Sequence, residues 1–157
     1  MFPEIQRVLY TREQIADRVK TLAAEMIVDL KADLAKDGQT ELDEDRVIII
    51  PIMTGAMIFV ADVVRELPMK LSLGLVAVSS YPGESVRSKG AHFATELPDN
   101  LEGKHIIVLD DILDSGQTLA LVHKMISKQN PASLRLGVML DKKVERTVDV
   151  HVDYVGF

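Results

Sequence analysis

The 157-residue sequence contains no cysteine, so it holds neither a disulfide framework nor a thiolate that binds metal or acts as a nucleophile. Its four histidines are scattered without the spacing of metal ligands. No uninterrupted apolar stretch is long enough to span a bilayer, and the first residues lack the basic-then-apolar pattern of a secretory signal. These absences predict a cytoplasmic protein without a membrane partner.

Basic residues are the minority among the charges. Eighteen Lys and Arg stand against 24 Asp and Glu, which gives a formal net charge of -6. This balance argues against an extended nucleic-acid surface, so we expect no nucleic-acid partner. The length suits one core, and we expect a single domain over residues 1–157.

Apolar runs alternate with segments of helical periodicity along the whole chain. Runs such as VIIIPI and HIIVL are typical of strands that are buried on both faces, as in parallel sheets. Thr11 and Gln14 form a capping-box pattern that predicts a helix start. The expected strands cover residues 5–10, 47–52, 71–79, 106–109, 133–140 and a last stretch from 150, and the expected helices cover 11–35, 56–67 and 118–129. The pattern predicts an α/β fold with a mostly parallel central sheet flanked by helices.

The most informative segment is HIIVLDDILDSGQTL, residues 105–119. It reads as a buried strand, then acids, then a small turn that opens a helix. Open α/β sheets bind ligands at the carboxyl ends of their strands, and a helix that begins there directs unpaired N–H groups at an anion. The segment therefore predicts a functional site.

The turn of this segment has the composition of a phosphate cradle. Asp114, Ser115, Gly116, Gln117 and Thr118 offer consecutive N–H groups, two hydroxyls and a glycine that permits close approach of the backbone. The alternative is that Ser115 or Thr118 only caps the helix. The sequence leaves both interpretations open.

Three carboxylates precede this cradle or begin it. Asp110 and Asp111 follow the buried run directly, where their burial is costly unless a cation or hydroxyl groups satisfy them, so a sugar diol, Mg²⁺ or both are the natural partners. Asp114 lies beyond them, in a position to exchange a proton with an incoming base. Its alternative role is that of a helix N-cap.

Residues 82–92 lose apolar periodicity and contain Gly, Ser, Arg and Lys. We expect a long loop or hairpin here. Its basic residues would suit a lid over an anionic substrate.

The segment VLDDILDSGQTL resembles the phosphoribosyl-pyrophosphate motif of type I phosphoribosyltransferases, and the surrounding chain resembles their hypoxanthine-guanine branch. The other segments that carry the likeness are VIIIPIMTGAMIFVADVVREL, the pair Ser80-Tyr81, VMLDKK and the final DYVGF. The resemblance implies a Rossmann-like core with a partial hood. It also implies a purine-salvage enzyme that transfers 5-phosphoribosyl from phosphoribosyl pyrophosphate to hypoxanthine or guanine, with Mg²⁺, giving IMP or GMP and pyrophosphate.

The resemblance assigns roles to particular residues. Asp110 and Asp111 would hold the ribose hydroxyls and the metal, directly or through water. Asp114 would act as acid and base at the purine N7, and residues 115–118 would hold the 5-phosphate. Lys142 would donate a hydrogen bond to the purine 6-oxygen, a contact that selects 6-oxo over 6-amino purines.

The pyrophosphate side is assigned in the same way. Thr54 and Gly55 would form the pyrophosphate loop, with a cis peptide expected at Met53–Thr54. Arg146 would reach pyrophosphate, and the loop opened by Ser80 and Tyr81 would close over the reaction and exclude water.

Two departures from the family pattern stand out. Many relatives carry lysine where this chain has Thr54, so the backbone of the loop would contribute more of the pyrophosphate binding here. Relatives also continue beyond the position of Phe157 with a segment that completes the purine pocket. Base recognition is therefore the less complete half of the expected site.

Two other functions fit part of the pattern. A non-catalytic regulator of the same fold would sense phosphoribosyl pyrophosphate or a nucleotide, but such regulators usually add a nucleic-acid-binding element or a basic face. A receiver-like phosphoacceptor domain distributes its acids over several strands, whereas here all three lie within residues 110–114. We also expect a homodimer or homotetramer, for which the apolar residues 56–64 offer an interface as well as a core.

Overall fold

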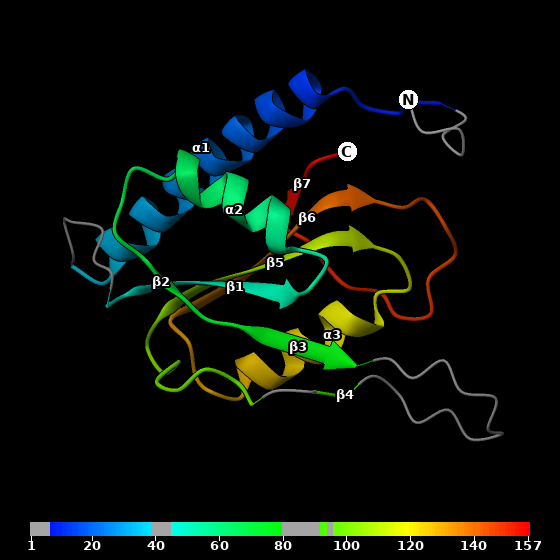
Figure 1. Ribbon diagram of the computed structural model, residues 1–157. Helices are drawn as coiled ribbons and strands as arrows, with labels where there is room; N and C mark the ends of the chain where they lie inside the picture. The colour runs from blue at the N-terminus through cyan, green and yellow to red at the C-terminus, as the bar shows by residue number, and fades with distance from the viewer. Residues whose placement is uncertain (1–6, 39–44, 80–91, 94–95) are drawn as a thin grey trace, which may run out of the picture.

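The computed structural model describes residues 7–38, 45–79, 92–93 and 96–157 (Figure 1). Within these residues a seven-stranded sheet has the order β4-β3-β1-β5-β6-β7, with β2 paired to β1. The β3–β4 pair is antiparallel and the other pairs are parallel. The strands are β1 (Val47–Met53), β2 (Ser72–Leu73), β3 (Val76–Ser79), β4 (His92–Phe93), β5 (His105–Leu113), β6 (Ser133–Asp141) and β7 (Tyr154–Val155).

The helices α1 (Arg12–Lys36) and α2 (Met57–Glu66) lie over one face of the sheet, and α3 (Gln117–Ser127) lies over the other (Figure 1). The predicted capping box starts α1, with Gln14 N donating to Thr11 Oγ1 at 3.2 Å and Thr11 N donating to Gln14 Oε1 at 2.8 Å. The α/β class and the mostly parallel sheet expected from the sequence are confirmed.

The apolar runs of β1 and β5 are buried because helices cover both faces of the sheet. Ile49 and Ile107 pack with α1 and α2 in one cluster, while Ile50 and Val108 pack with α3 in the other. All four are 0% exposed. Alternate side chains of each strand therefore point to opposite layers, which accounts for the unbroken hydrophobic pattern.

Three expected strands differ in the structure. Residues 7–10 of the expected strand 5–10 form no strand, and residues 1–6 lie outside the described part. The expected strand 71–79 divides into β2 and β3 at Gly74, which packs against Pro98 so closely that a Cβ would lie 2.7 Å from the proline Cγ. The last strand is limited to Tyr154–Val155.

The expected loop 82–92 falls almost entirely outside the described residues, except for His92 at the start of β4. No helix of the described chain is long and apolar enough to cross a membrane.

Candidate active site

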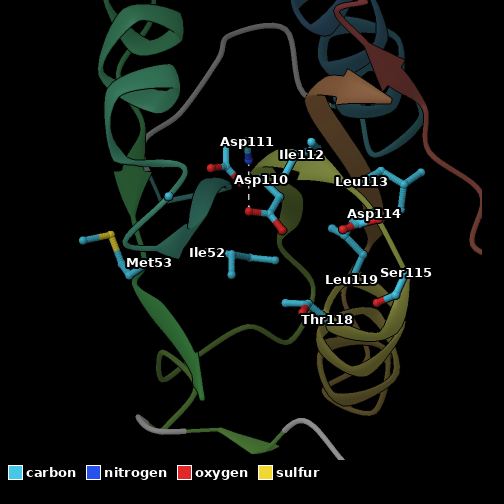
Figure 2. Close-up of a pocket in the computed structure, with 12 residues that line it drawn as sticks. Ile52, Met53, Asp110, Asp111, Ile112, Leu113, Asp114, Ser115, Thr118 and Leu119 are labelled. Atoms are coloured by element: carbon cyan, nitrogen blue, oxygen red, sulfur yellow. Dashed lines mark hydrogen bonds between the residues drawn. The ribbon is translucent and has the colours of Figure 1, made fainter. Parts of the chain in front are cut away.

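A cavity of about 250 Å³ opens where β1 and β5 end and α3 begins (Figure 2). It lies at the carboxyl edge of the parallel strands, where the sequence predicted a site. The lining residues come from these three elements and the turns beside them: Ile52, Met53, Gly55, Asp110, Asp111, Ile112, Leu113, Asp114, Ser115, Gly116, Thr118 and Leu119.

Asp110 and Asp111 belong to β5 itself, because this strand continues to Leu113 rather than ending at Leu109. The pairing with β6 continues as far, and it sets Leu113 opposite Asp141. The sequence placed the acids after the strand because their charge interrupts the apolar run. Backbone pairing with β6 nevertheless outweighs that interruption.

Asp110 is 8% exposed and accepts a hydrogen bond from Asp111 N at 3.0 Å (Figure 2). Burial raises the pKa of Asp110 to about 7, and the neighbouring charge of Asp111 adds to this rise against the lowering effect of the backbone hydrogen bond. Asp110 is therefore a buried carboxyl that gains from any cation or hydroxyl brought next to it.

The turn between β1 and α2 packs directly on Asp111. A Cβ added at Gly55 would lie 2.5 Å from Asp111 Oδ2, so a larger residue there would have to displace the Asp111 carboxylate. The Met53–Thr54 peptide before it is cis, as the family resemblance led us to expect. The expected pyrophosphate loop and the second carboxylate are thus in contact.

The phosphate cradle begins α3 without a side-chain cap. The N-cap is Gly116, with φ +80°, which has no side chain to cap the helix, and Gln117 N donates a long hydrogen bond to Ser115 Oγ at 3.5 Å. The phosphate-binding and capping interpretations of Ser115 therefore both stay predictions. Ser115 and Thr118 lie along the cavity beside the start of the helix (Figure 2), where the first-turn N–H groups favour an anion.

Lys142 and Asp114 meet at the mouth of this region. Their Nζ and Oδ2 atoms are 3.1 Å apart, and both side chains are about half exposed, at 49% and 55%. The strand register explains the meeting, because β5 and β6 remain paired to Leu113 and Asp141, and Lys142 N then donates to Leu113 O at 3.1 Å.

Other predicted residues lie beside the cavity rather than on its wall. Arg146 pairs with Asp141 and also donates to Lys142 O at 3.4 Å. The side chain of Gln117 donates to Thr147 Oγ1 at 3.0 Å, so it turns away from the cradle. Thr54 does not line the cavity.

Ser80 and Tyr81 lie outside the described residues.

Sequence reasoning missed several residues of the site. Ile52, Ile112 and Leu119 form apolar wall, and their sequence pattern is that of ordinary core residues. Thr147 contacts the cradle from a distant loop, and no local motif marks it. Such a contact between distant segments becomes visible only in the folded chain.

Residues 9–157 match the phosphoribosyl transferase domain family. The chain belongs to this family.

The relatives within it come from the branch that the motifs resemble. A hypoxanthine-guanine phosphoribosyltransferase of Mycobacterium avium is 34% identical over 155 residues, which make up 98% of this chain and 73% of the relative. A hypoxanthine-guanine-xanthine phosphoribosyltransferase of Tritrichomonas foetus is 32% identical over 160 residues, covering 100% of this chain and 79% of the relative. The structure of the Trypanosoma cruzi hypoxanthine phosphoribosyltransferase in complex with the product IMP superposes with a TM-score of 0.83 at 28% identity, covering 100% and 82% of the two chains.

Proposed function

We propose that this protein is a hypoxanthine-guanine phosphoribosyltransferase of purine salvage, which transfers 5-phosphoribosyl from phosphoribosyl pyrophosphate to a 6-oxopurine. The observation that carries the proposal is the arrangement along one cavity of a phosphate cradle at the start of α3 and a carboxylate pair at the end of β5, with Lys142 beside the cavity and paired with Asp114 on its wall. Phosphate, sugar and base each find a group of matching chemistry there. The names of the relatives support the same assignment.

The 5-phosphate is assigned to the cradle. The backbone N–H groups at the start of α3 and the hydroxyls of Ser115 and Thr118 supply hydrogen-bond donors, and the helix terminus favours negative charge. Gly116 lets the backbone approach the phosphate oxygens.

Asp110 and Asp111 are assigned to the ribose hydroxyls and to Mg²⁺. Among the described residues no cluster of three or more His, Cys, Asp or Glu forms a complete metal site. Two adjacent carboxylates nevertheless fit Mg²⁺, which proteins commonly hold through one or two carboxylates together with substrate phosphates. When bound, the ion neutralises charge on the departing pyrophosphate.

The base is assigned to Asp114 and Lys142. In our proposal the purine separates this ion pair: Lys142 donates to the 6-oxygen, and the Asp114 carboxylate accepts the proton that N7 releases as the new bond to the sugar forms. A 6-amino group has no free acceptor for Lys142, so adenine is disfavoured. The carboxylates nearby stabilise positive charge on the ribosyl ring as pyrophosphate leaves. On the pyrophosphate side, the backbone of Thr54 and Gly55 and the side chains of Arg146, Ser80 and Tyr81 stay candidate contacts.

The direct test is a Mg²⁺-dependent assay of the purified chain with phosphoribosyl pyrophosphate and each of hypoxanthine, guanine, xanthine and adenine, with pyrophosphate release as the readout. Turnover with a 6-oxopurine supports the proposal. Tight binding of phosphoribosyl pyrophosphate by calorimetry without turnover would instead favour the non-catalytic sensor.

The role of Asp114 has its own test. Asp114→Asn keeps the shape but loses the base, so kcat should fall by about 10²- to 10⁴-fold, the usual contribution of general acid–base catalysis. The affinity for phosphoribosyl pyrophosphate should change far less. Unchanged kcat would remove Asp114 from the proton transfer.

We also propose that the protein forms a homodimer or homotetramer through the outer face of α2. Met57 and Ile58 are 50% and 66% exposed there, although both are large and apolar. Ile58→Glu should lower the mass seen by analytical ultracentrifugation, whereas an unchanged mass would contradict this choice of face. The cytoplasmic location and the single domain over residues 1–157 stay predictions.

A further inference from the structure

The loop between β6 and β7 is fastened to the phosphate cradle by hydrogen bonds that no motif predicted. Thr147 Oγ1 donates to Ser115 O at 3.0 Å, and Val148 N donates to the same oxygen at 3.3 Å. The Thr147 hydroxyl in turn accepts a hydrogen bond from Gln117 Nε2 at 3.0 Å. Both hydrogen-bonding functions of this one hydroxyl are thus engaged by the cradle.

The cradle and the loop also fit each other sterically. Gly116 is buried, and a Cβ added to it would lie 2.4 Å from Val148 O. Its φ of +80° already favours glycine. The loop backbone therefore packs directly on Gly116, which also lines the cavity.

These contacts orient one particular donor. The Ser115–Gly116 peptide is trans and planar, so its C=O and N–H groups point in opposite directions. Thr147 and Val148 hold the C=O on the side of the loop. The N–H of Gly116 is thereby directed away from the loop, and both Ser115 and Gly116 line the cavity.

We propose that Thr147 is a positioning residue for phosphate binding: it holds the Ser115–Gly116 peptide so that the Gly116 N–H faces the 5-phosphate. This inference rests on the proposed function, because it assigns the 5-phosphate to the cradle. The same loop begins beside Lys142, so the phosphate-binding and base-binding parts of the site share one support.

The test compares three variants. Thr147→Val removes the hydroxyl and keeps the branched shape, whereas Thr147→Ser keeps the hydroxyl. Thr21→Val is the control, because the Thr21 hydroxyl also donates to a backbone carbonyl. Its acceptor is Asp17 O, at 3.0 Å on the exposed side of α1. A neutral hydrogen bond contributes about 0.5–1.5 kcal/mol, which corresponds to about two- to tenfold in affinity. We expect Thr147→Val to raise KM for phosphoribosyl pyrophosphate by about this factor with kcat nearly unchanged, as for a contact made equally in the ground and transition states.

A purely structural role gives a different result. Loss of folded protein lowers kcat at constant KM, so that pattern would overturn the inference. Wild-type values of both constants for Thr147→Val would overturn it too. Thr147→Ser and Thr21→Val should both retain wild-type KM.

A measurement on the wild-type protein decides the matter even if Thr147→Val fails to fold. The ¹⁵N–¹H resonance of Gly116 should shift when inorganic phosphate is added, and Thr147→Ser should preserve the shift. A Gly116 resonance that does not respond to phosphate would refute the proposed orientation. If the wild-type chain turns over no phosphoribosyl pyrophosphate, the proposed function fails. The phosphate titration still tests the inference, because a shift of the Gly116 resonance that is smaller in Thr147→Val than in Thr147→Ser supports the role of the hydroxyl, and equal shifts overturn it.

Discussion

Replacing Asp110 by asparagine should make the free protein more stable at pH 8. The folded protein holds a proton on Asp110 up to its pKa of about 7, whereas the unfolded chain releases that proton near the ordinary value of 3.8. The free energy of unfolding therefore falls as pH rises from about 4 to about 7, and this loss persists above pH 7. Asp110→Asn removes the titration and keeps an oxygen for the hydrogen bond from Asp111 N.

The size of the effect follows from the raised pKa. Each pKa unit corresponds to about 1.36 kcal/mol, so a rise from 3.8 to about 7 corresponds to about 4 kcal/mol. Asp110 is only 8% exposed, so solvent screens little of this. Typical domains unfold with only about 5–15 kcal/mol, which makes the change easy to measure.

The assay is urea unfolding of the wild type and Asp110→Asn at pH 5 and pH 8, without Mg²⁺ or substrate. The gain of the variant over the wild type should be larger at pH 8 than at pH 5 by about 2–3 kcal/mol, because about 1.6 kcal/mol of the effect is already present at pH 5. The comparison between pH values cancels any constant cost of burying the amide. Asp99→Asn, at an exposed position, controls for the loss of one negative charge. A gain that is the same at both pH values would refute the argument. The same variant should bind Mg²⁺ with phosphoribosyl pyrophosphate more weakly, because a carboxylate is lost.

Three further substitutions test other parts of the site and the fold. Lys142→Met should lower kcat/KM for hypoxanthine and guanine by about 10- to 100-fold, the worth of a charge-assisted hydrogen bond, and an equal loss with adenine would contradict the assigned contact. Gly55→Ala should displace the Asp111 carboxylate, because the added Cβ would lie 2.5 Å from its Oδ2, and we expect at least about a tenfold loss in kcat/KM for phosphoribosyl pyrophosphate. The stability should change little, because Gly55 is exposed and the displaced atoms are the end of a side chain. Asp33→Asn should lower the unfolding free energy by about 2 kcal/mol at pH 7, because the hydrogen bond from Arg135 lowers the pKa of buried Asp33 to about 2. This stabilisation is present above pH 4 and is lost as pH falls toward 2. Urea unfolding of the wild type and the variant should therefore differ at pH 7 and converge at pH 2.

The sequence predicted most of the fold, because unbroken apolar runs and a capping box are local signals. The prediction of one strand over residues 71–79 was wrong in detail, because the structure has two strands there. The break at Gly74 depends on packing against Pro98, which is remote in the sequence. The expected strand 5–10 was wrong over its described residues 7–10, because a short apolar run forms a strand only where a neighbour pairs with it.

The site residues also divide into those that a local motif marks and those that only long-range packing brings to the site. Asp110, Asp111 and the cradle lie within residues 110–118, so one motif located them, and the structure places all of them except Gln117 along one cavity. The family resemblance singled out Lys142, which no local pattern would have separated from a surface lysine. Thr147 was missed because its partners lie on another loop, and only the packing of β6 and β7 brings it there.

The register between β5 and β6 has a consequence for how substrate preference can change. Those two strands pair from His105 opposite Ser133 to Leu113 opposite Asp141. Because Asp114 and Lys142 are the next residues after the last pair, this register places them side by side. Inserting or deleting a single residue within β6 would leave a hydrophobic strand able to pair, yet it would move Lys142 away from Asp114 and exchange the inward and outward faces of the strand. The position of Lys142 beside Asp114 is thus set by the backbone pairing of β5 with β6. Altered base preference in this lineage is therefore expected to arise by side-chain replacement, with strand length held constant.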